Sequence, residues 1–312
     1  MSMAWFLFSA ILVSVFTGIS GVTDVFRPTH ISFAAETAVS SAAKDTYGGM
    51  DSPVKLDPES LGVKLTAPSS ALVDTKTGSV LFSEGSERIV PIASITKLMT
   101  AMVFLDTGPD WDAPVTFERS DEEKEGIPYI ATGETLTVRD TFRTALVGSA
   151  NNAALALVRS TGLSRSEFVS RMNAKAMRLG LTHTAFSDPT GFDAENVSTS
   201  LEVARMAWSA LSYPEIREVL TMREYAFSSV DGIRHRIPAT NALLSSYLNE
   251  GEYEIVGGKT GYTDEALYTL VIRAKNGSAD AIGVVLGSAS VDDRFQDLKA
   301  LFTWGFENFS WK

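Results

Sequence analysis

Three short strings of chemically active residues follow one another along the chain. They are Ser94-Ile95-Thr96-Lys97, Ser149-Ala150-Asn151 and Lys259-Thr260-Gly261. Together they supply a hydroxyl nucleophile with an amine one helical turn away, a second hydroxyl beside an amide, and a cationic strand suited to hold a carboxylate. This combination of groups favours acyl-transfer chemistry.

Each string is weak evidence alone, because similar strings occur elsewhere in the chain. Ser-x-x-Lys also stands at residues 41–44 and 52–55, in a stretch without helical periodicity, and Lys-Thr-Gly also stands at residues 76–78, where it predicts a hairpin turn. Ser94 differs, because it follows Pro91 and opens an apolar pattern typical of a buried helix. A serine there could still serve merely as a helix N-cap. The prediction of acyl-transfer chemistry therefore rests on the order in which the three strings follow one another.

The spacing of Ser94 and Lys97 suits a nucleophile and its base. Residues at i and i+3 share one helix face, so the Lys97 amine can reach the Ser94 hydroxyl. A lysine at its ordinary pKa of about 10.4 is almost fully protonated at pH 7. The base role therefore requires burial or a second cation, for which Lys259 is the candidate. Backbone amides at the helix start would face a developing oxyanion.

The middle string lies where one helical segment, residues 138–147, breaks at Gly148 and another begins at Asn152. A break between two helices can present short polar side chains to a cleft, although the tripeptide alone indicates a helix cap with a polar turn. Beside the other two strings, Ser149 becomes a proton shuttle between Lys97 and the leaving amine. Asn151 then offers both a donor and an acceptor to a substrate amide.

The last string predicts a strand that can bind an anion. Lys259 and Thr260 would hold a free carboxylate, the lysine as a point charge and the threonine as a hydroxyl donor. Gly261 would let another group approach the strand closely, and the Tyr262 amide would be a second oxyanion donor. Alone, the string indicates an exposed edge strand protected by a lysine.

With these strings in place, the sequence resembles the penicillin-recognising serine peptidases, specifically the low-molecular-mass D-alanyl-D-alanine carboxypeptidases. The resemblance runs from about residue 62 to the end and is carried by residues 71–74, 77–82, 91–100, 135–154, 186–192, 240–244 and 303–306. Two positions depart from the family pattern. Ala150 stands where glycine is frequent, and Leu267 stands where many relatives place glycine.

The resemblance implies a role for each site residue: Ser94 as nucleophile, Lys97 as base, Ser149 as shuttle, Asn151 as amide contact, and Lys259 with Thr260 as carboxylate site. The implied substrate is a peptidoglycan pentapeptide that ends in D-Ala-D-Ala. An acyl-enzyme would form on Ser94, the terminal D-alanine would leave, and water would hydrolyse the ester. β-Lactams would be covalent inhibitors. No metal or cofactor is expected, since the chain has three histidines, no cysteine and no His-Glu-x-x-His string.

Three other functions stay open. A D,D-endopeptidase acting on cross-linked peptidoglycan would use the same residues on a larger acyl acceptor. A serine β-lactamase is disfavoured, because Ala150 stands where class A enzymes have aspartate and no Glu-x-x-Leu-Asn string follows. A penicillin-binding sensor is disfavoured too, because mere binding requires neither a base nor a shuttle.

The order of elements predicts an α+β fold of the serine β-lactamase and DD-peptidase type. Apolar runs at residues 267–274 and 281–286, joined by Asn276-Gly277, predict a hairpin, and a second hairpin is expected around residues 76–78. Strands from both chain ends would form an antiparallel sheet flanked by helices, with a helical subdomain inserted between them. The acidic run at residues 118–125 predicts a solvated loop.

Residues 61–312 are expected to form the catalytic domain. Residues 1–34 would be a signal peptide or membrane anchor, since residues 4–22 are uncharged and mostly apolar, and residues 35–60 would be a flexible linker. The catalytic part would then work outside the cytoplasmic membrane, in the periplasm or cell wall. A net charge of −11 argues against nucleic acid as a partner. The family's C-terminal β-rich domain is not expected.

Overall fold

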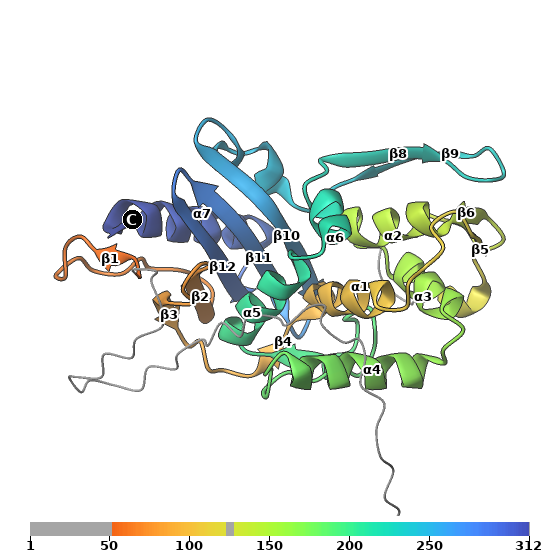
Figure 1. Ribbon diagram of the computed structural model, residues 1–312, viewed down its shortest axis with the longest axis horizontal. Helices are drawn as coiled ribbons and strands as arrows, with labels where there is room; N and C mark the ends of the chain where they lie inside the picture. Colours follow the sequence, from red (N-terminus) through yellow and green to blue (C-terminus); the bar gives the residue numbers. More distant parts are fainter. Residues whose placement is uncertain (1–51, 123–127, 312) are drawn as a thin grey trace, which may run out of the picture. The chain divides into compact units, whose positions relative to one another are not determined.

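The computed structural model describes residues 52–122 and 128–311, which include a five-stranded antiparallel sheet (Figure 1). Its strands, in spatial order, are β10 (Tyr253–Thr263), β11 (Leu267–Asn276), β12 (Ala279–Ser288), β2 (Ser69–Asp74) and β3 (Val80–Glu84). Because β12 pairs with β2, strands from both ends of the chain meet in one sheet. The predicted α+β architecture and both predicted hairpins are confirmed.

The two faces of this sheet bury different cores, because successive side chains of a strand point to opposite sides. Val73 and Val284 belong to the core shared with the helical region, whereas Leu72 and Val285 belong to the core under α7 (Val291–Asn308). Helix α7 packs on β11, β12 and β2. The period-two apolar pattern thus fixes a sheet with helices on both faces.

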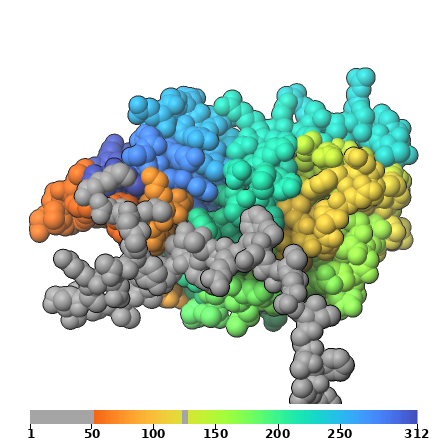
Figure 2. Space-filling view, in the orientation of Figure 1, coloured from red at the N-terminus to blue at the C-terminus, as the bar shows by residue number. Residues whose placement is uncertain are grey.

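The helical region lies between β3 and β10 in sequence and confirms the predicted insertion. Its helices are α1 (Lys97–Leu105), α2 (Val138–Val147), α3 (Asn151–Ser160), α4 (Arg165–Arg178), α5 (Ser200–Ala210) and α6 (Pro214–Leu220). Helix α5 packs against β12, β2 and β11, and so joins the insertion to the sheet. In the space-filling view the blue residues of the sheet directly adjoin the cyan and green residues of this region (Figure 2).

Short elements complete the fold. The two-stranded ribbons pair β1 (Val54–Lys55) with β13 (Phe309–Ser310), β4 (Val90–Pro91) with β7 (Val197–Ser198), β5 (Pro114–Thr116) with β6 (Thr135–Thr137), and β8 (Glu224–Ser228) with β9 (Arg234–Pro238). The 3-10 turns are η1 (Ala93–Thr96), η2 (Arg119–Asp121), η3 (Ala242–Ser245) and η4 (Tyr247–Asn249).

The acidic run at residues 118–125 differs from the predicted solvated loop at one position. Asp121, in η2, is buried and accepts hydrogen bonds from Nε and Nη2 of Arg159 at 3.1 and 2.8 Å. The carboxylate can be buried as a charged group because the guanidinium of Arg159, in α3, hydrogen-bonds to both of its oxygens. Residues 123–127 lie outside the described residues.

The predicted N-terminal segments fall largely outside the described part of the chain, including residues 1–34 and the apolar stretch 4–22. Of the predicted linker, residues 52–60 are described, and Val54–Lys55 pair with Phe309–Ser310. This end of the linker is therefore part of the folded unit. Within the described ranges, none of the helices has the length and apolar character needed to cross a membrane.

Candidate active site

Ser94 and Lys97 lie at the junction of η1 and α1. Ser94 is in the 3-10 turn, and Lys97 is the first residue of the α-helix. The predicted helix therefore begins with a 3-10 turn, in which side chains at i and i+3 eclipse one another. Lys97 Nζ lies 2.8 Å from Ser94 Oγ, and the lysine side chain is almost completely buried. The amine and the hydroxyl are in the contact that their spacing predicts.

Two carbonyl groups hold the Lys97 amine from other directions. Nζ donates to Oδ1 of Asn151 at 2.6 Å and to the backbone oxygen of Thr190 at 2.7 Å. Carbonyl oxygens only accept hydrogen bonds, so each of them occupies one N–H of the amine. A third tetrahedral position of the nitrogen faces Ser94 Oγ. In the neutral amine this position can hold the lone pair that receives the serine proton.

Ser149 occupies the break between α2 and α3. Its φ of +58° lies in the left-handed region, which non-glycine residues adopt mainly where the surroundings hold them in place. Ser149 Oγ accepts a hydrogen bond from Lys259 Nζ at 2.7 Å. The helix break confirms the sequence prediction, with α3 beginning at Asn151, one residue earlier than expected.

Lys259 lies on β10, at the edge of the sheet, yet only 1% of its surface is exposed. The alternative of a solvent-exposed protective lysine is therefore wrong. Its amine donates to Ser149 Oγ and to the Thr260 backbone oxygen at 2.8 Å. Burial, and then the positive charges of Lys97 and Arg294, hold the pKa of Lys259 well below its ordinary value. An anionic ligand would offset this concentration of positive charge.

Arg294 is a site residue that the sequence strings do not reveal. It lies in the first turn of α7, is 8% exposed, and donates from Nη1 to the Gly261 backbone oxygen at 3.0 Å. Its Nε is buried and has no hydrogen-bond partner among the described residues. The guanidinium lies 4.8 Å from the ring centroid of Phe295 and 5.5 Å from that of Tyr268. A largely buried cation in the wall of a cleft suits a carboxylate ligand.

These groups border one cleft of about 400 Å³. Its lining includes Ser94, Ser149, Asn151, Gly191, Thr240, Thr260, Gly261, Tyr262 and Arg294. Thr240 is a second residue that the strings miss, and its hydroxyl accepts from Thr260 Oγ1 at 2.6 Å. Lys97 and Lys259 are not part of the lining. Each amine therefore acts on the cleft through the serine hydroxyl that it contacts.

Gly261 explains how β10 comes so close to the turn that carries Ser94. A Cβ at this position would lie 2.4 Å from Thr269 Oγ1 and 3.0 Å from both Ala93 Cβ and the Ile92 oxygen. Only glycine leaves room for that approach. The strand that carries Lys259 is consequently packed against the turn that carries Ser94.

The family model described as D-alanyl-D-alanine carboxypeptidase matches residues 56–290. The chain belongs to this family. A D-alanyl-D-alanine endopeptidase of Pseudomonas aeruginosa is 34% identical over 248 residues, 77% of each chain. The D-alanyl-D-alanine carboxypeptidase DacF of Bacillus subtilis is 33% identical over 251 residues, which are 78% of this chain but 63% of that protein.

Solved structures agree with these matches. The DD-transpeptidase of Streptomyces K15 is similar with a TM-score of 0.74 and 28% identity, over 80% of this chain and 100% of that chain. Penicillin-binding protein D2 of Listeria monocytogenes, solved in its cefotaxime-bound form, has a TM-score of 0.69 and 29% identity. The match covers 79% of this chain and 100% of that chain. Family and fold together identify a serine-type D-Ala-D-Ala carboxypeptidase, which is a hydrolase.

Proposed function

We propose that this carboxypeptidase removes the terminal D-alanine from peptidoglycan stem peptides that end in D-Ala-D-Ala, through an acyl-enzyme on Ser94. One observation carries the assignment of roles: the Ser94 hydroxyl contacts the buried Lys97 amine, while the Ser149 hydroxyl in the same cleft contacts the buried Lys259 amine. The cleft thus presents a nucleophile with a base and a second hydroxyl with its own proton donor.

In the first half-reaction, Ser94 Oγ attacks the carbonyl carbon of the penultimate D-alanine, and Lys97 receives the hydroxyl proton. The oxyanion develops beside the backbone amides of Ser94 and Tyr262. Ser149 then transfers its hydroxyl proton to the leaving amine and regains one from Lys259, so that the peptide bond breaks and free D-alanine departs. In the second half-reaction water attacks the ester and gives one proton to Lys259 by way of Ser149, while Lys97 returns its proton to Ser94 Oγ, so that the acid product leaves and the starting state is restored.

The carboxylate of the terminal D-alanine is assigned to the side of the cleft lined by Thr260 and Arg294, with the buried Lys259 next to Thr260 in β10. The Arg294 guanidinium would donate one charge-assisted hydrogen bond to it, and the charge of the buried Lys259 would attract it. The paired hydroxyls of Thr260 and Thr240 would lie beside it. Asn151 would contact the amide of the acyl-donor peptide. A site built for a free carboxylate supports the carboxypeptidase reaction.

Endopeptidase activity on cross-linked peptides is the second candidate, because relatives from Pseudomonas aeruginosa, Escherichia coli and Haemophilus influenzae are named D-alanyl-D-alanine endopeptidases. The same nucleophile, base and shuttle would serve it. Incubation with a pentapeptide and, separately, with a purified cross-linked muropeptide dimer discriminates the two. Release of D-alanine without cleavage of the dimer supports carboxypeptidase action, and the reverse supports the endopeptidase.

β-Lactams are proposed as covalent inhibitors that acylate Ser94, in line with the cefotaxime-bound relative. The site of action is proposed to be outside the cytoplasmic membrane, where peptidoglycan lies, with residues 4–22 as export signal or anchor. Fractionation of cells that express the full chain, probed with an antibody, tests this location. Recovery of the protein only from the cytosol would contradict it.

Substitution of the nucleophile is the direct test of the assigned chemistry. Ser94→Ala is expected to abolish both labelling by a fluorescent penicillin and release of D-alanine from a pentapeptide. Ser52→Ala is the matched control, because Ser52 also heads a Ser-x-x-Lys string but is exposed. Labelling that persists in Ser94→Ala would refute the assignment. Rapid release of hydrolysed penicillin by the wild type would indicate a β-lactamase instead.

A further inference from the structure

A loop between Ala185 and Val197 is built around one buried carboxylate. Ala185 and Val197 pair as an isolated β-bridge and close the loop at its base. Inside it, Asp188 is 4% exposed and accepts hydrogen bonds from five donors of the loop itself. The donors are the amides of Thr190, Gly191 and Asp193, the Thr190 hydroxyl and the Asn196 side-chain amide.

These hydrogen bonds favour the ionised form of the carboxylate. Burial acts to raise the pKa of Asp188, but the hydrogen bonds from Asp193, Thr190 and Gly191 outweigh it and hold the pKa below its ordinary value. The loop conformation therefore depends on a charged acceptor. In an amide side chain at this position, the NH2 group would replace one carboxylate oxygen and would face N–H or O–H groups that also donate.

Three consecutive loop residues contact the elements that carry the nucleophile and base. The Pro189 oxygen accepts from Thr100 Oγ1 at 2.6 Å, and the Thr190 oxygen accepts from Lys97 Nζ at 2.7 Å. Gly191 has φ +83°, and a Cβ there would lie 1.9 Å from the Ala93 oxygen. The loop is thus packed directly on η1 and α1.

The contact at Gly191 matters because Ala93 is itself in an unusual conformation. Ala93 directly precedes Ser94 and has φ +49°, in the left-handed region that alanine rarely adopts. Such a conformation persists only where the surroundings hold it. The backbone of Gly191, fixed by its amide hydrogen bond to Asp188 Oδ1 at 2.7 Å, lies against this turn.

We propose that Asp188 is a positioning residue for acylation: it holds the Thr190 carbonyl on the Lys97 amine and the Gly191 backbone on the turn that carries Ser94. The Thr190 and Asn151 oxygens occupy two N–H positions of the amine, so their placement decides whether the third faces the serine. Asp188 touches neither substrate nor nucleophile and acts through these two neighbours. The inference rests on the roles proposed above for Ser94 and Lys97.

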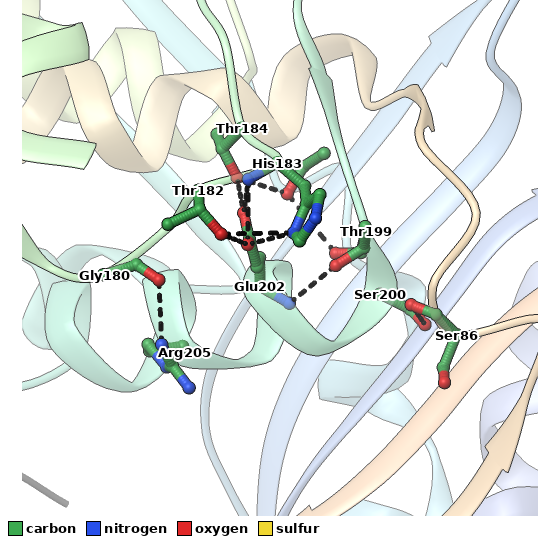
Figure 3. A network of polar contacts seen from close by, with 10 residues as sticks. Ser86, Gly180, Thr182, His183, Thr184, Thr199, Ser200, Glu202 and Arg205 are labelled. Carbon is green, nitrogen blue, oxygen red and sulfur yellow. Dashed lines mark hydrogen bonds and ion pairs between the residues drawn. The ribbon is translucent and has the colours of Figure 1, made fainter. Parts of the chain in front are cut away.

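Glu202 provides a matched control, because it is a second buried carboxylate and accepts hydrogen bonds from the segment that leads into the same loop. This buried carboxylate of α5 accepts from the His183 amide at 2.9 Å and from the Thr184 hydroxyl at 2.6 Å, just before the loop base (Figure 3). Figure 3 shows these donors converging on Glu202 from the segment that precedes Ala185. Glu202→Gln therefore disturbs a comparable set of hydrogen bonds, but none that reaches Lys97 or Ser94.

The test is single-turnover acylation by a fluorescent penicillin, with the amplitude and the rate constant measured separately. The amplitude reports the folded fraction, whereas the rate constant reports only molecules that react. Asp188→Asn is expected to lower the rate constant by between roughly tenfold and a hundredfold, while Glu202→Gln lowers at most the amplitude and the melting temperature. An unchanged rate constant in Asp188→Asn overturns the proposal, as does an equal loss in Glu202→Gln.

A milder variant covers the case in which Asp188→Asn yields too little folded protein. Thr190→Val removes one donor to Asp188 but keeps the carbonyl that contacts Lys97, so a smaller fall in the same rate constant is expected. A wild-type rate constant in Thr190→Val then overturns the proposal. Labelling that persists in Ser94→Ala would instead show that the proposed function has failed, which keeps the two failures distinct.

Discussion

Replacement of Arg294 by methionine is predicted to separate recognition of the substrate carboxylate from the rest of catalysis. Methionine keeps an unbranched apolar stem of similar length but removes the guanidinium, whose Nε is buried without a hydrogen-bond partner among the described residues. The expected result is a loss of kcat/KM for a peptide that ends in a free D-Ala-D-Ala carboxylate, because one charge-assisted hydrogen bond to that carboxylate disappears.

The size of the loss follows from the number of available donors. One N–H of Nη1 already donates to the Gly261 oxygen and Nε is buried, so we count one further hydrogen bond from the rest of the guanidinium to the ligand. One hydrogen bond to a charged group contributes about 1.5–3 kcal/mol. At about 1.4 kcal/mol for each factor of ten, kcat/KM should fall by roughly 10- to 150-fold.

The assay compares the acid substrate with the same peptide carrying a C-terminal carboxamide. Arg294→Met should penalise the acid far more than the carboxamide, because only the acid presents the charge. The loss of the Gly261 contact affects both substrates and cancels in their ratio. Arg294→Lys should recover part of the preference, since it keeps the charge but not the planar fork. An acid-to-carboxamide ratio that stays at the wild-type value in folded Arg294→Met would refute the reasoning.

Two further predictions concern stability. The pKa of Lys259 is lower in the folded than in the unfolded protein, so at a pH between the two pKa values the lysine is protonated mainly in the unfolded chain. The free energy of unfolding should therefore rise with pH between these two pKa values, up to the ordinary lysine pKa of about 10.4. Urea denaturation of wild type and Lys259→Met at several alkaline pH values should show a flatter rise in the variant, and parallel curves would contradict the cause given. Leu267→Gly should increase stability by up to about 1 kcal/mol, because relief of the left-handed strain slightly exceeds the entropy cost of glycine. Leu267 has φ +53° and is 43% exposed. Leu61→Gly is its control, since this exposed leucine has no left-handed conformation to relieve, and equal melting-temperature shifts in both variants would exclude the explanation.

Much of the fold was predictable because its signals are local. An Asn-Gly turn between two apolar runs, a helix that breaks at Gly148 and a serine three residues before a lysine each depend on neighbours in sequence. The observed α2 matches the predicted residues 138–147, and Ser94 contacts Lys97 as their spacing requires. Even the unusual Leu267, noticed as a departure from the family pattern, proves to have a left-handed backbone.

The parts of the site that sequence reasoning missed depend on tertiary contacts instead. Arg294 belongs to no string, and its place in the cleft follows from how α7 packs on the sheet. Thr190 contributes a backbone oxygen, which any residue could supply, so residue type carries no signal of its contact with Lys97. The buried Asp121 was missed for a related reason, since only the fold brings Arg159 beside it.

The charge arrangement of the cleft connects substrate binding with proton transfer. Burial and the nearby charges of Lys97 and Arg294 lower the pKa of Lys259, and none of the described residues that line the cleft is acidic. A bound substrate carboxylate would supply the missing negative charge and favour the protonated form of Lys259. That amine donates to Ser149, the hydroxyl assigned to protonate the leaving amine. A peptide with a free carboxylate would therefore keep Lys259 protonated and able to supply Ser149 with a proton. A peptide without a carboxylate would leave Lys259 less protonated and less able to do so.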